Sequence, residues 1–254
     1  MHILVTNDDG VNAPGLLALA REMRSIGKVT VLAPDRNWSA SGHVKTMHRP
    51  LRVKEIQLAD GSLAWASDGA PSDCVALGLL GFIPEKIDLV VAGINPIANI
   101  GYDVTYSGTV TAAMEAAIGG VPGIAFSIHA TEELQGAPDY SPAARVAYKI
   151  VKEVSTNGHF VNLLLNVNIP YLPDDLIKGI LITRQGLRVY RDRLDQRIDP
   201  RGRPYYWIGG ESPTAIPDEG TDFGAVEQGY VSITPLQLDL TDFHALDYLR
   251  EIIW

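Results

Sequence analysis

The chain has 254 residues, of which 46% are hydrophobic and 20% are charged, and its formal net charge is −9. This composition excludes an intrinsically disordered chain and a collagen-like repeat, and the single cysteine, Cys74, excludes a disulfide scaffold. No apolar run reaches the roughly 18 residues of a membrane helix, and the acidic balance disfavours a nucleic-acid polymer as partner.

The first 170 residues alternate apolar runs with segments of helical periodicity. Predicted strands cover 2–7, 28–33, 87–93, 123–129 and 161–168, and predicted helices cover 13–26, 73–82, 109–118 and 142–156. The strand segments are apolar on both faces, as is typical of a parallel sheet covered by helices. This alternation predicts an α/β fold with an open, doubly wound, mainly parallel sheet.

Two regions interrupt this pattern. Within 45–67, two strand-like runs flank Ala59-Asp60-Gly61, and Asp-Gly between β-formers predicts a hairpin. From about residue 184 the sequence becomes irregular, apart from a β-rich stretch at 231–236 and a last helix near 242–251. The start, MHILVTNDDG, lacks the features of a signal peptide, and with the lone cysteine it leads us to expect a cytoplasmic protein.

Polar residues follow several predicted strands, where open α/β sheets bind their ligands. They include Asn7, Asp8, Asp9 and Asn12 after the first strand, Ser39 after the second, and Asn95 and Asn99 after the 87–93 strand. Ser107-Gly108-Thr109 then opens a helix. Because parallel strands end at one edge, we expect these groups to converge there.

Two adjacent carboxylates need a cation beside them, and oxygen ligands suit Mg²⁺, Mn²⁺ or Ca²⁺ better than zinc. Ser107-Gly108-Thr109 would add backbone N–H groups at a helix N-terminus, which favour an anion. A divalent cation beside an anion cradle indicates phosphate-ester chemistry. Each element also has a simpler explanation, because Asp8-Asp9-Gly10 is equally typical of a solvated turn and Ser107 of a helix cap.

At this point the residues resemble a known family. The strings ILVTNDDGVNAPGL, VLAPDRNWSASGH, AGINPIANIGYDVTYSGTVTAAMEAA and GTDFGAVEQGYVSITPL occur in order over nearly the whole chain. They resemble the survival protein E (SurE-like) family of metal-dependent acid phosphatases acting on nucleoside 5′- and 3′-monophosphates, and in some members on short polyphosphate. The resemblance implies a Rossmann-like catalytic core, assigned here to 1–183, and a region at 184–254 whose C-terminal extension is swapped in a homodimer or a tetramer.

The resemblance also implies which residues act. One divalent cation per subunit would be held by Asp8, Asp9, Ser39 and Asn95, and the phosphate by the turn at Ser107, Gly108 and Thr109. In the mechanism that we infer from these groups, Asp8 or Asp9 would orient or deprotonate the attacking water, and Asn12 and Asn99 would contact either the phosphate or the residues that hold the cation. The chain departs from the family pattern at Pro96 and Ile97, where Ile97 replaces the usual glycine, and at Thr111 and Ala116. These departures bear on substrate preference more than on reaction class.

Three alternatives remain beside this interpretation. A phospho-acceptor receiver domain is shorter and needs an aspartate where this chain has Asn95. A haloacid-dehalogenase-type phosphatase would carry Asp-x-Asp instead of adjacent acids. A non-catalytic nucleotide-binding or assembly protein on the same fold is the third, and a phosphate-release assay would distinguish it.

Two further segments suggest contacts beyond the core. Residues 184–203 hold seven of the 21 basic residues and three acids, which predicts either a solvated, salt-bridged arm or a rim that attracts anionic substrate or a neighbouring subunit. The chain ends in apolar Ile252-Ile253-Trp254, and an exposed apolar terminus favours a partner.

Overall fold

The computed structural model describes residues 1–130, 136–156 and 163–252, except for the side chains of 211–213. Within these residues the main sheet has nine strands in the order β3-β4-β2-β1-β5-β6-β7-β11-β8. Its strands are β1 (His2–Thr6), β2 (Lys28–Pro34), β3 (Val53–Gln57), β4 (Leu63–Ser67), β5 (Leu89–Asn95), β6 (Gly123–His129), β7 (Leu164–Pro170), β8 (Ile180–Ile182) and β11 (Val231–Pro235). Within this nine-stranded sheet only the β3–β4 and β7–β11 pairs are antiparallel. The structure thus confirms the predicted α/β fold with a mainly parallel sheet.

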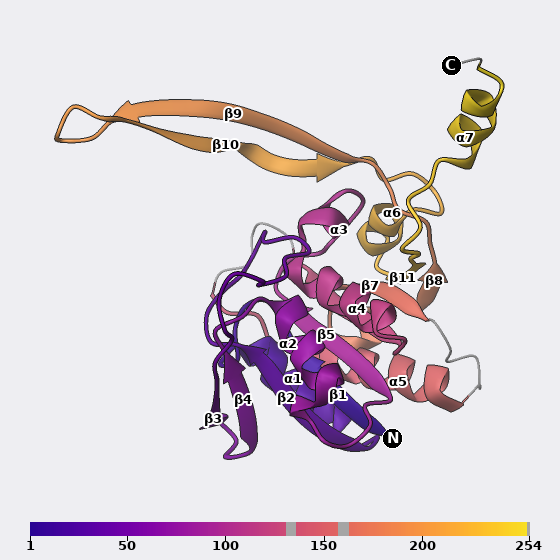
Figure 1. Cartoon of the computed structure of the whole chain (residues 1–254). Helices are drawn as coiled ribbons and strands as arrows, with labels where there is room; N and C mark the ends of the chain where they lie inside the picture. Colours follow the sequence, from indigo (N-terminus) through magenta and orange to yellow (C-terminus); the bar gives the residue numbers. More distant parts are fainter. Residues whose placement is uncertain (131–135, 157–162, 253–254) are drawn as a thin grey trace.

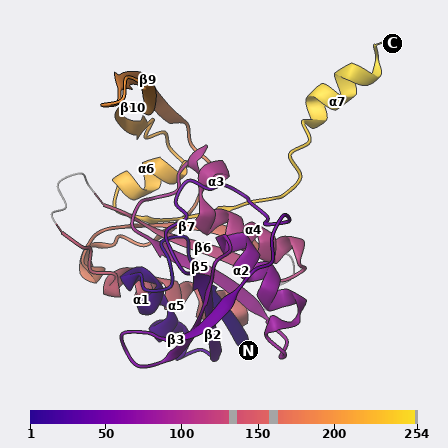
Figure 2. The same ribbon diagram turned by 60° about the vertical axis from the view of Figure 1, so that its left-hand side comes forward.

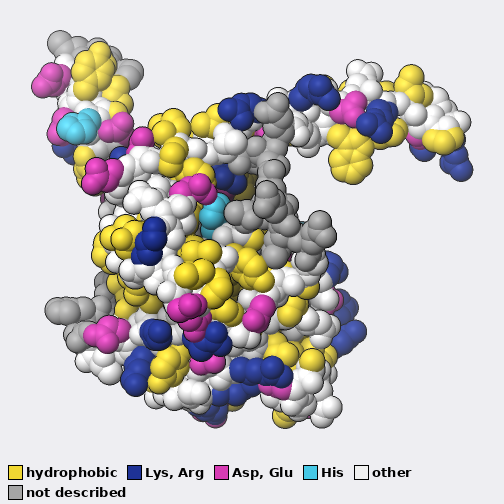
Figure 3. Space-filling model, turned by 180° about the vertical axis from the view of Figure 1, so that it is seen from behind, with side chains coloured by type: hydrophobic (Ala, Val, Ile, Leu, Met, Phe, Trp, Pro, Cys, Tyr) yellow, Lys and Arg dark blue, Asp and Glu magenta, His cyan; other side chains and the backbone are white. Residues whose placement is uncertain are grey.

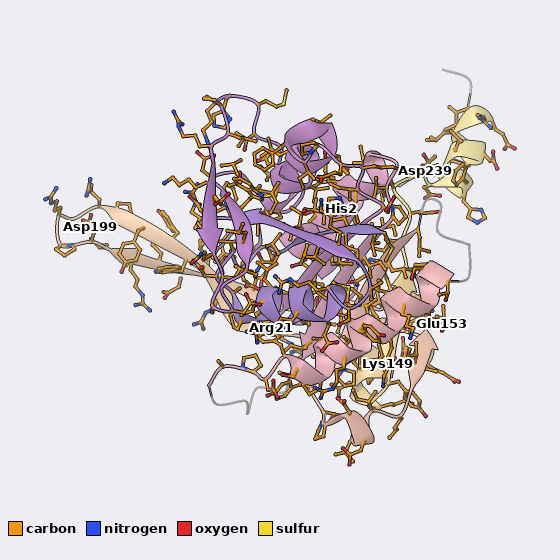
Figure 4. The ribbon with its side chains drawn as sticks, turned by 90° about the horizontal axis from the view of Figure 1, so that it is seen from below. His2, Arg21, Lys149, Glu153, Asp199 and Asp239 are labelled. Atoms are coloured by element: carbon orange, nitrogen blue, oxygen red, sulfur yellow. The ribbon has the colours of Figure 1, made fainter. Side chains whose placement is uncertain are left out.

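Helices cover both faces of the sheet (Figures 1 and 2). One face carries α1 (Pro14–Met23) and α5 (Ser141–Thr156), and the other carries α2 (Pro71–Leu77) and α4 (Gly108–Ile118). Figure 4 shows α1, marked by Arg21, lying beside α5, marked by Lys149 and Glu153. The largest cluster of buried apolar side chains, which includes Leu16, Phe126 and Ile150, fills the space between the sheet and these two helices.

Most predicted elements are present, with shifted boundaries. The hairpin predicted within 45–67 is confirmed, since β3 and β4 pair in antiparallel register and Gly61 has a φ of +79°. The helix predicted over 73–82 is divided into α2 and a π-helical turn (Gly78–Phe82). Regular helix does not continue through this turn, since Gly81 has a non-helical φ of +111°. The strand predicted over 161–168 begins at Leu164 in β7, and residues 161 and 162 lie outside the described part of the chain.

The segment after residue 184 is more regular than its sequence indicates. β9 (Arg188–Ile198) and β10 (Pro204–Ala215) form a long antiparallel hairpin that projects from the body, with Asp199 at its far end (Figures 1 and 4). Its arginines form local ion pairs, Arg197 with Asp195 at 2.7 Å and Arg203 with Asp199 at 3.1 Å. The salt-bridged arm is therefore present as a β-hairpin, and attraction of substrate by it stays a prediction.

The last part of the chain divides between the body and a second projection. After α6 (Asp222–Glu227), β11 pairs with β7 and β8, so the main sheet includes strands from both regions of the proposed division at 183/184. That division therefore stays a prediction. The predicted last helix is α7 (Phe243–Arg250), which has no buried residue and stands apart from the body (Figure 2). Ile253 and Trp254 lie outside the described residues.

Candidate active site

The segments after β1 and β2 are joined by backbone hydrogen bonds at the carboxyl edge of the sheet. Trp38 N donates to Asp8 O at 2.7 Å, and Val11 N donates to Pro34 O at 2.8 Å. Gly10 has a φ of +103°, and a Cβ there would lie 3.2 Å from the carbonyl carbon of Arg36. The loop that carries Ser39 is therefore held against the Asp8-Asp9-Gly10 turn.

Asp8 joins this turn to the N-terminus of α4. Its side chain is buried, and its carboxylate accepts from Thr109 N at 3.1 Å and from Thr109 Oγ1 at 2.5 Å. A Cβ on Gly108 would lie only 2.7 Å from Asp8 Cβ, so glycine is required there by the approach of this aspartate. Burial raises the pKa of Asp8, although the Thr109 and Gly108 donors oppose that shift.

The predicted phosphate turn forms the start of α4. Ser107 is the N-cap, and its Oγ accepts from Val110 N at 3.1 Å. The backbone N–H and the hydroxyl of Thr109 are both engaged by Asp8, so in this structure Thr109 positions that carboxylate. A phosphate at this turn would lie beside Asp8, and the phosphate-binding roles of Ser107, Gly108 and Thr109 stay predictions.

Asp9 is the second acidic group of the turn. Burial, and then the charge of Asp8, raises the pKa of Asp9 to about 7. No Lys, Arg or His within the described ranges forms an ion pair with either aspartate. Two adjacent carboxylates, one buried and one half-buried, without a cationic side chain beside them fit a site for a bound cation.

The possible ligands of that cation come from three segments. No group of three or more His, Cys, Asp or Glu side chains in the described residues could hold a metal ion, so the two aspartates would need other oxygen donors. Ser39 is exposed on the loop held against Asp8, and Asn95 ends β5, the neighbour of β1. A hydroxyl and an amide oxygen would complete an oxygen-ligand set suited to Mg²⁺, Mn²⁺ or Ca²⁺.

The backbone before Asn95 is shaped by Gly93. Gly93 has a φ of +130°, a Cβ there would lie 2.3 Å from Phe126 O, and the β5–β6 register shifts between Ala92 and Asn95. The Asn95 side chain donates to Ile97 O at 2.5 Å, while the Ile97 side chain is 66% exposed. The departure at Ile97 therefore leaves this asparagine fixed by its own loop.

Asn99 lies in a buried network of amides. Its backbone N donates to Asn168 Oδ1 at 2.8 Å, and its carbonyl accepts from Asn166 and Asn168. Its side chain donates to Ser127 Oγ at 2.8 Å. The structure thus uses Asn99 to fix its loop, and its contact with phosphate stays a prediction.

Two residues that the sequence did not single out shape the same region. Glu115 on α4 bonds His43 Nε2 at 2.9 Å and Lys45 Nζ at 3.0 Å, which anchors the loop after Ser39 and gives His43 a structural contact. Tyr140 precedes α5 and lines a cavity of about 410 Å³ together with Asp9 and Asn12. Burial, and next the charge of Asp9, raises the pKa of Tyr140 to about 12, so its hydroxyl stays protonated. Glu115 lies within the third of the quoted strings, but its contacts with His43 and Lys45 have no local signal, and Tyr140 lies in none of the strings, so only the tertiary structure reveals these roles.

None of the helices in the described residues is both long and apolar enough to cross a membrane.

Comparisons with known proteins agree on one family. The model of the family "Survival protein SurE" matches residues 3–192. The "5′-nucleotidase SurE" of Herpetosiphon aurantiacus is 50% identical over 254 residues, covering 100% of this chain and 99% of that protein. The protein of the same name from Chloroflexus aggregans is also 50% identical, with 100% of both chains covered.

A solved structure shows the same likeness in three dimensions. The crystal structure of the SurE protein from Aquifex aeolicus superposes with a TM-score of 0.81 at 44% identity, covering 99% of this chain and 100% of that one. The chain belongs to the survival protein SurE family.

Proposed function

We propose that this protein is a divalent-metal-dependent phosphomonoesterase that hydrolyses nucleoside 5′-monophosphates to nucleoside and phosphate. The proposal includes 3′-monophosphates and short polyphosphate as further substrates. Full-length relatives that are about 50% identical are named 5′-nucleotidases, and they support the nucleotide as substrate. The non-catalytic alternative has no such support.

One observation of the geometry carries the proposal. At the carboxyl edge of the sheet, two adjacent carboxylates have no ion-pair partner in the described residues, and the buried one, Asp8, contacts the N-terminus of α4 while Asp9 beside it is half-buried. Such an edge is where α/β folds bind their ligands, and a helix N-terminus favours the negative charge of a phosphoryl group. Binding and hydrolysis of a phosphate ester require both features, because the carboxylates can hold a cation and the helix N-terminus can bind the phosphate anion.

Asp8, Asp9, Ser39 and Asn95 would hold one divalent cation, with Mg²⁺ or Mn²⁺ preferred and Ca²⁺ as a possible occupant. When bound, the cation supplies Lewis-acid polarisation of the phosphoryl group. Thr109 holds Asp8 in one orientation through two donors, and Ser107 fixes the first turn of α4. The dipole of α4 stabilises negative charge that develops on the phosphoryl oxygens.

We expect phosphate release from a nucleoside 5′-monophosphate in the presence of Mg²⁺ or Mn²⁺, falling to background when EDTA removes the cation. The reason is that two uncompensated carboxylates at this edge would otherwise repel the phosphate. Phosphate release should return when the cation is added in excess over EDTA. A substrate panel of 5′-, 3′- and deoxynucleotides and polyphosphate, each with several cations, provides the measurement. Nucleotide binding without any phosphate release would instead favour the non-catalytic alternative.

The proposal includes a homodimer or a tetramer, built by the hairpin β9–β10 and by α7. Large apolar side chains are exposed on both projections, and Figure 3 shows them mixed with charged groups. On the hairpin, Trp207 is 63% and Ile208 82% exposed, and Leu240 before α7 is 92% exposed. Apolar groups on segments that contact little of their own chain favour a protein partner, and a second copy would cover both.

Removing residues 241–254 is expected to lower the molar mass measured by light scattering from that of the oligomer towards the monomer. The physical reason is that no residue of α7 is fully buried in its own chain, so an exchanged helix would contribute most of its apolar face to the partner. Circular dichroism and a thermal melt check that the body remains folded. A truncated protein that keeps the full oligomer mass would contradict a role for this helix, and the double substitution Trp207→Ser, Ile208→Ser would then test the hairpin.

A further inference from the structure

A cavity of about 410 Å³ opens on the Asp9 side of the candidate site. Its wall combines apolar groups, chiefly Pro14, Pro96 and the Tyr140 ring, with the polar side chains of Asp9, Asn12 and Arg36. The volume lies within the range of about 300–1,000 Å³ that small-molecule sites occupy. A mainly apolar wall with a few polar groups is suited to a ring system that carries hydroxyl or amino groups.

The positions of the two aspartates show on which side of the candidate site the cavity lies. Asp8 turns to the N-terminus of α4, where Thr109 N donates to its carboxylate, and it does not line the cavity. The neighbouring Asp9 does line it. A phosphate ester held at the two carboxylates, with its phosphoryl oxygens towards α4, therefore has its alcohol part on the cavity side.

Tyr140 is a fixed part of this wall. The side chain is 7% exposed, and its ring packs on the start of α1, since a Cβ on Gly15 would lie 3.1 Å from Tyr140 Cε1. Its carbonyl accepts from Ala144 N at 2.9 Å, and Asp139 N donates to Tyr171 Oη at 2.9 Å. Among the described residues its hydroxyl has no hydrogen-bond partner, so it is available as a donor to a ligand.

Arg36 is an exposed residue that also lines the cavity. Its guanidinium lies over the Trp38 ring, with Cζ 5.3 Å from the ring centroid, and it also lines a second cavity of about 470 Å³ with Arg52 and Lys54. A planar guanidinium supported by an aromatic ring can stack on a nucleobase or bond its acceptors. The polar edge of the cavity thus matches a base more closely than an aliphatic alcohol.

We propose that this cavity is the subsite for the nucleoside half of the substrate, with Tyr140 and Pro96 packing on its rings and Arg36 bonding its polar edge. The inference rests on the proposed nucleotidase function. The inference assigns Tyr140 a role in specificity. This residue would favour nucleotides over phosphate esters of small alcohols, and it would contribute little to the hydrolysis of the small esters.

The test compares two substrates across matched variants. Tyr140→Leu is expected to raise KM for adenosine 5′-monophosphate about tenfold, while kcat/KM for glycerol phosphate changes less than about twofold. Arg36→Gln should also raise KM for adenosine 5′-monophosphate, by a smaller factor. Because Arg36 is exposed, this variant should fold even if Tyr140→Leu proves unstable. Tyr148→Leu, also on the α5 side but outside the cavity, is the control.

Titration calorimetry with adenosine separates this inference from the proposed function. Adenosine should bind the wild-type protein, and Tyr140→Leu should weaken that binding by a similar factor, whether or not phosphate esters are hydrolysed. Nucleoside binding with this loss but without phosphate release would overturn the nucleotidase and leave the subsite in place. Equal losses on both substrates, or unchanged KM and adenosine binding in the Tyr140 and Arg36 variants, would overturn the subsite.

Discussion

The substitution Asp8→Asn is expected to lower kcat for nucleoside monophosphate hydrolysis by on the order of 10³-fold. The change removes one of the two negative charges proposed to hold the cation. It also replaces one carboxylate oxygen with an NH₂ group. That group cannot accept from the Thr109 donors, which bond the two carboxylate oxygens at 3.1 and 2.5 Å. Steady-state kinetics with Mg²⁺ or Mn²⁺ measures the effect, and circular dichroism checks the fold.

Asp175→Asn is the matched control for this experiment. Asp175 is exposed in the short 3₁₀ turn Asp174–Leu176, on a different part of the surface, and the same loss of charge there should leave kcat unchanged. Full turnover by the Asp8→Asn protein would show that this carboxylate neither holds the cation nor assists the chemistry. The metal assignment would then be wrong, because Asp9 alone would have to serve.

Gly108→Ala is expected to reduce kcat about 100-fold while leaving the fold largely intact. The new methyl group would lie 2.7 Å from Asp8 Cβ, 3.0 Å from its Oδ2 and 3.2 Å from Pro71 Cγ, so Asp8 or the first turn of α4 must move. Overpacking of this kind costs about 1–3 kcal/mol of stability, and a displacement of about 1 Å at a reacting group can cost about 100-fold in rate. Kinetics and urea denaturation report the two effects separately.

Gly209→Ala supplies the comparison for Gly108→Ala. An added Cβ at Gly209, in β10, meets no heavy atom within 4 Å, so the same chemical change there should alter neither kcat nor the urea midpoint. Wild-type kcat in the Gly108→Ala protein would mean that the close approach of α4 to Asp8 has no part in turnover. A loss of stability with normal kcat would assign Gly108 to folding alone.

The convergence of the site residues was predictable from the sequence because parallel strands all end at one edge. Asp8, Ser39 and Asn95 follow strands whose apolar runs are clear, and the order of these strands brings their ends together. The partners within that edge were not predictable. Thr109 has the sequence pattern of a helix start, and nothing local indicates that both of its donors bond Asp8.

Other features could not be predicted, because their sequences lack hydrophobic periodicity or because their contacts join residues far apart in the chain. β9 and β10 are exposed along most of their length, so no hydrophobic alternation marks them and charged residues disguise a regular hairpin. Asn166 and Asn168 lie within an apolar strand, and their bonds to Asn99 join residues that are 67 and 69 positions apart in the chain. Tyr140 stands alone before a helix, and only the packing of α5 against α1 places it beside Asp9.

The contacts that shape the site also set an order on its assembly. Thr109 is 101 residues from Asp8, and the buried Asp222, which accepts from Gly101 N at 2.9 Å and Gly186 N at 2.8 Å, is 121 residues from Gly101. Contacts of such long sequence separation form late, since the intervening chain must first be closed into a loop. During synthesis, the loop that leads into α4 therefore acquires its anchor only after most of the polypeptide has left the ribosome. A nascent chain that ends before Asp222 contains the strands of the site but lacks the Asp222 carboxylate that holds the loop at Gly101.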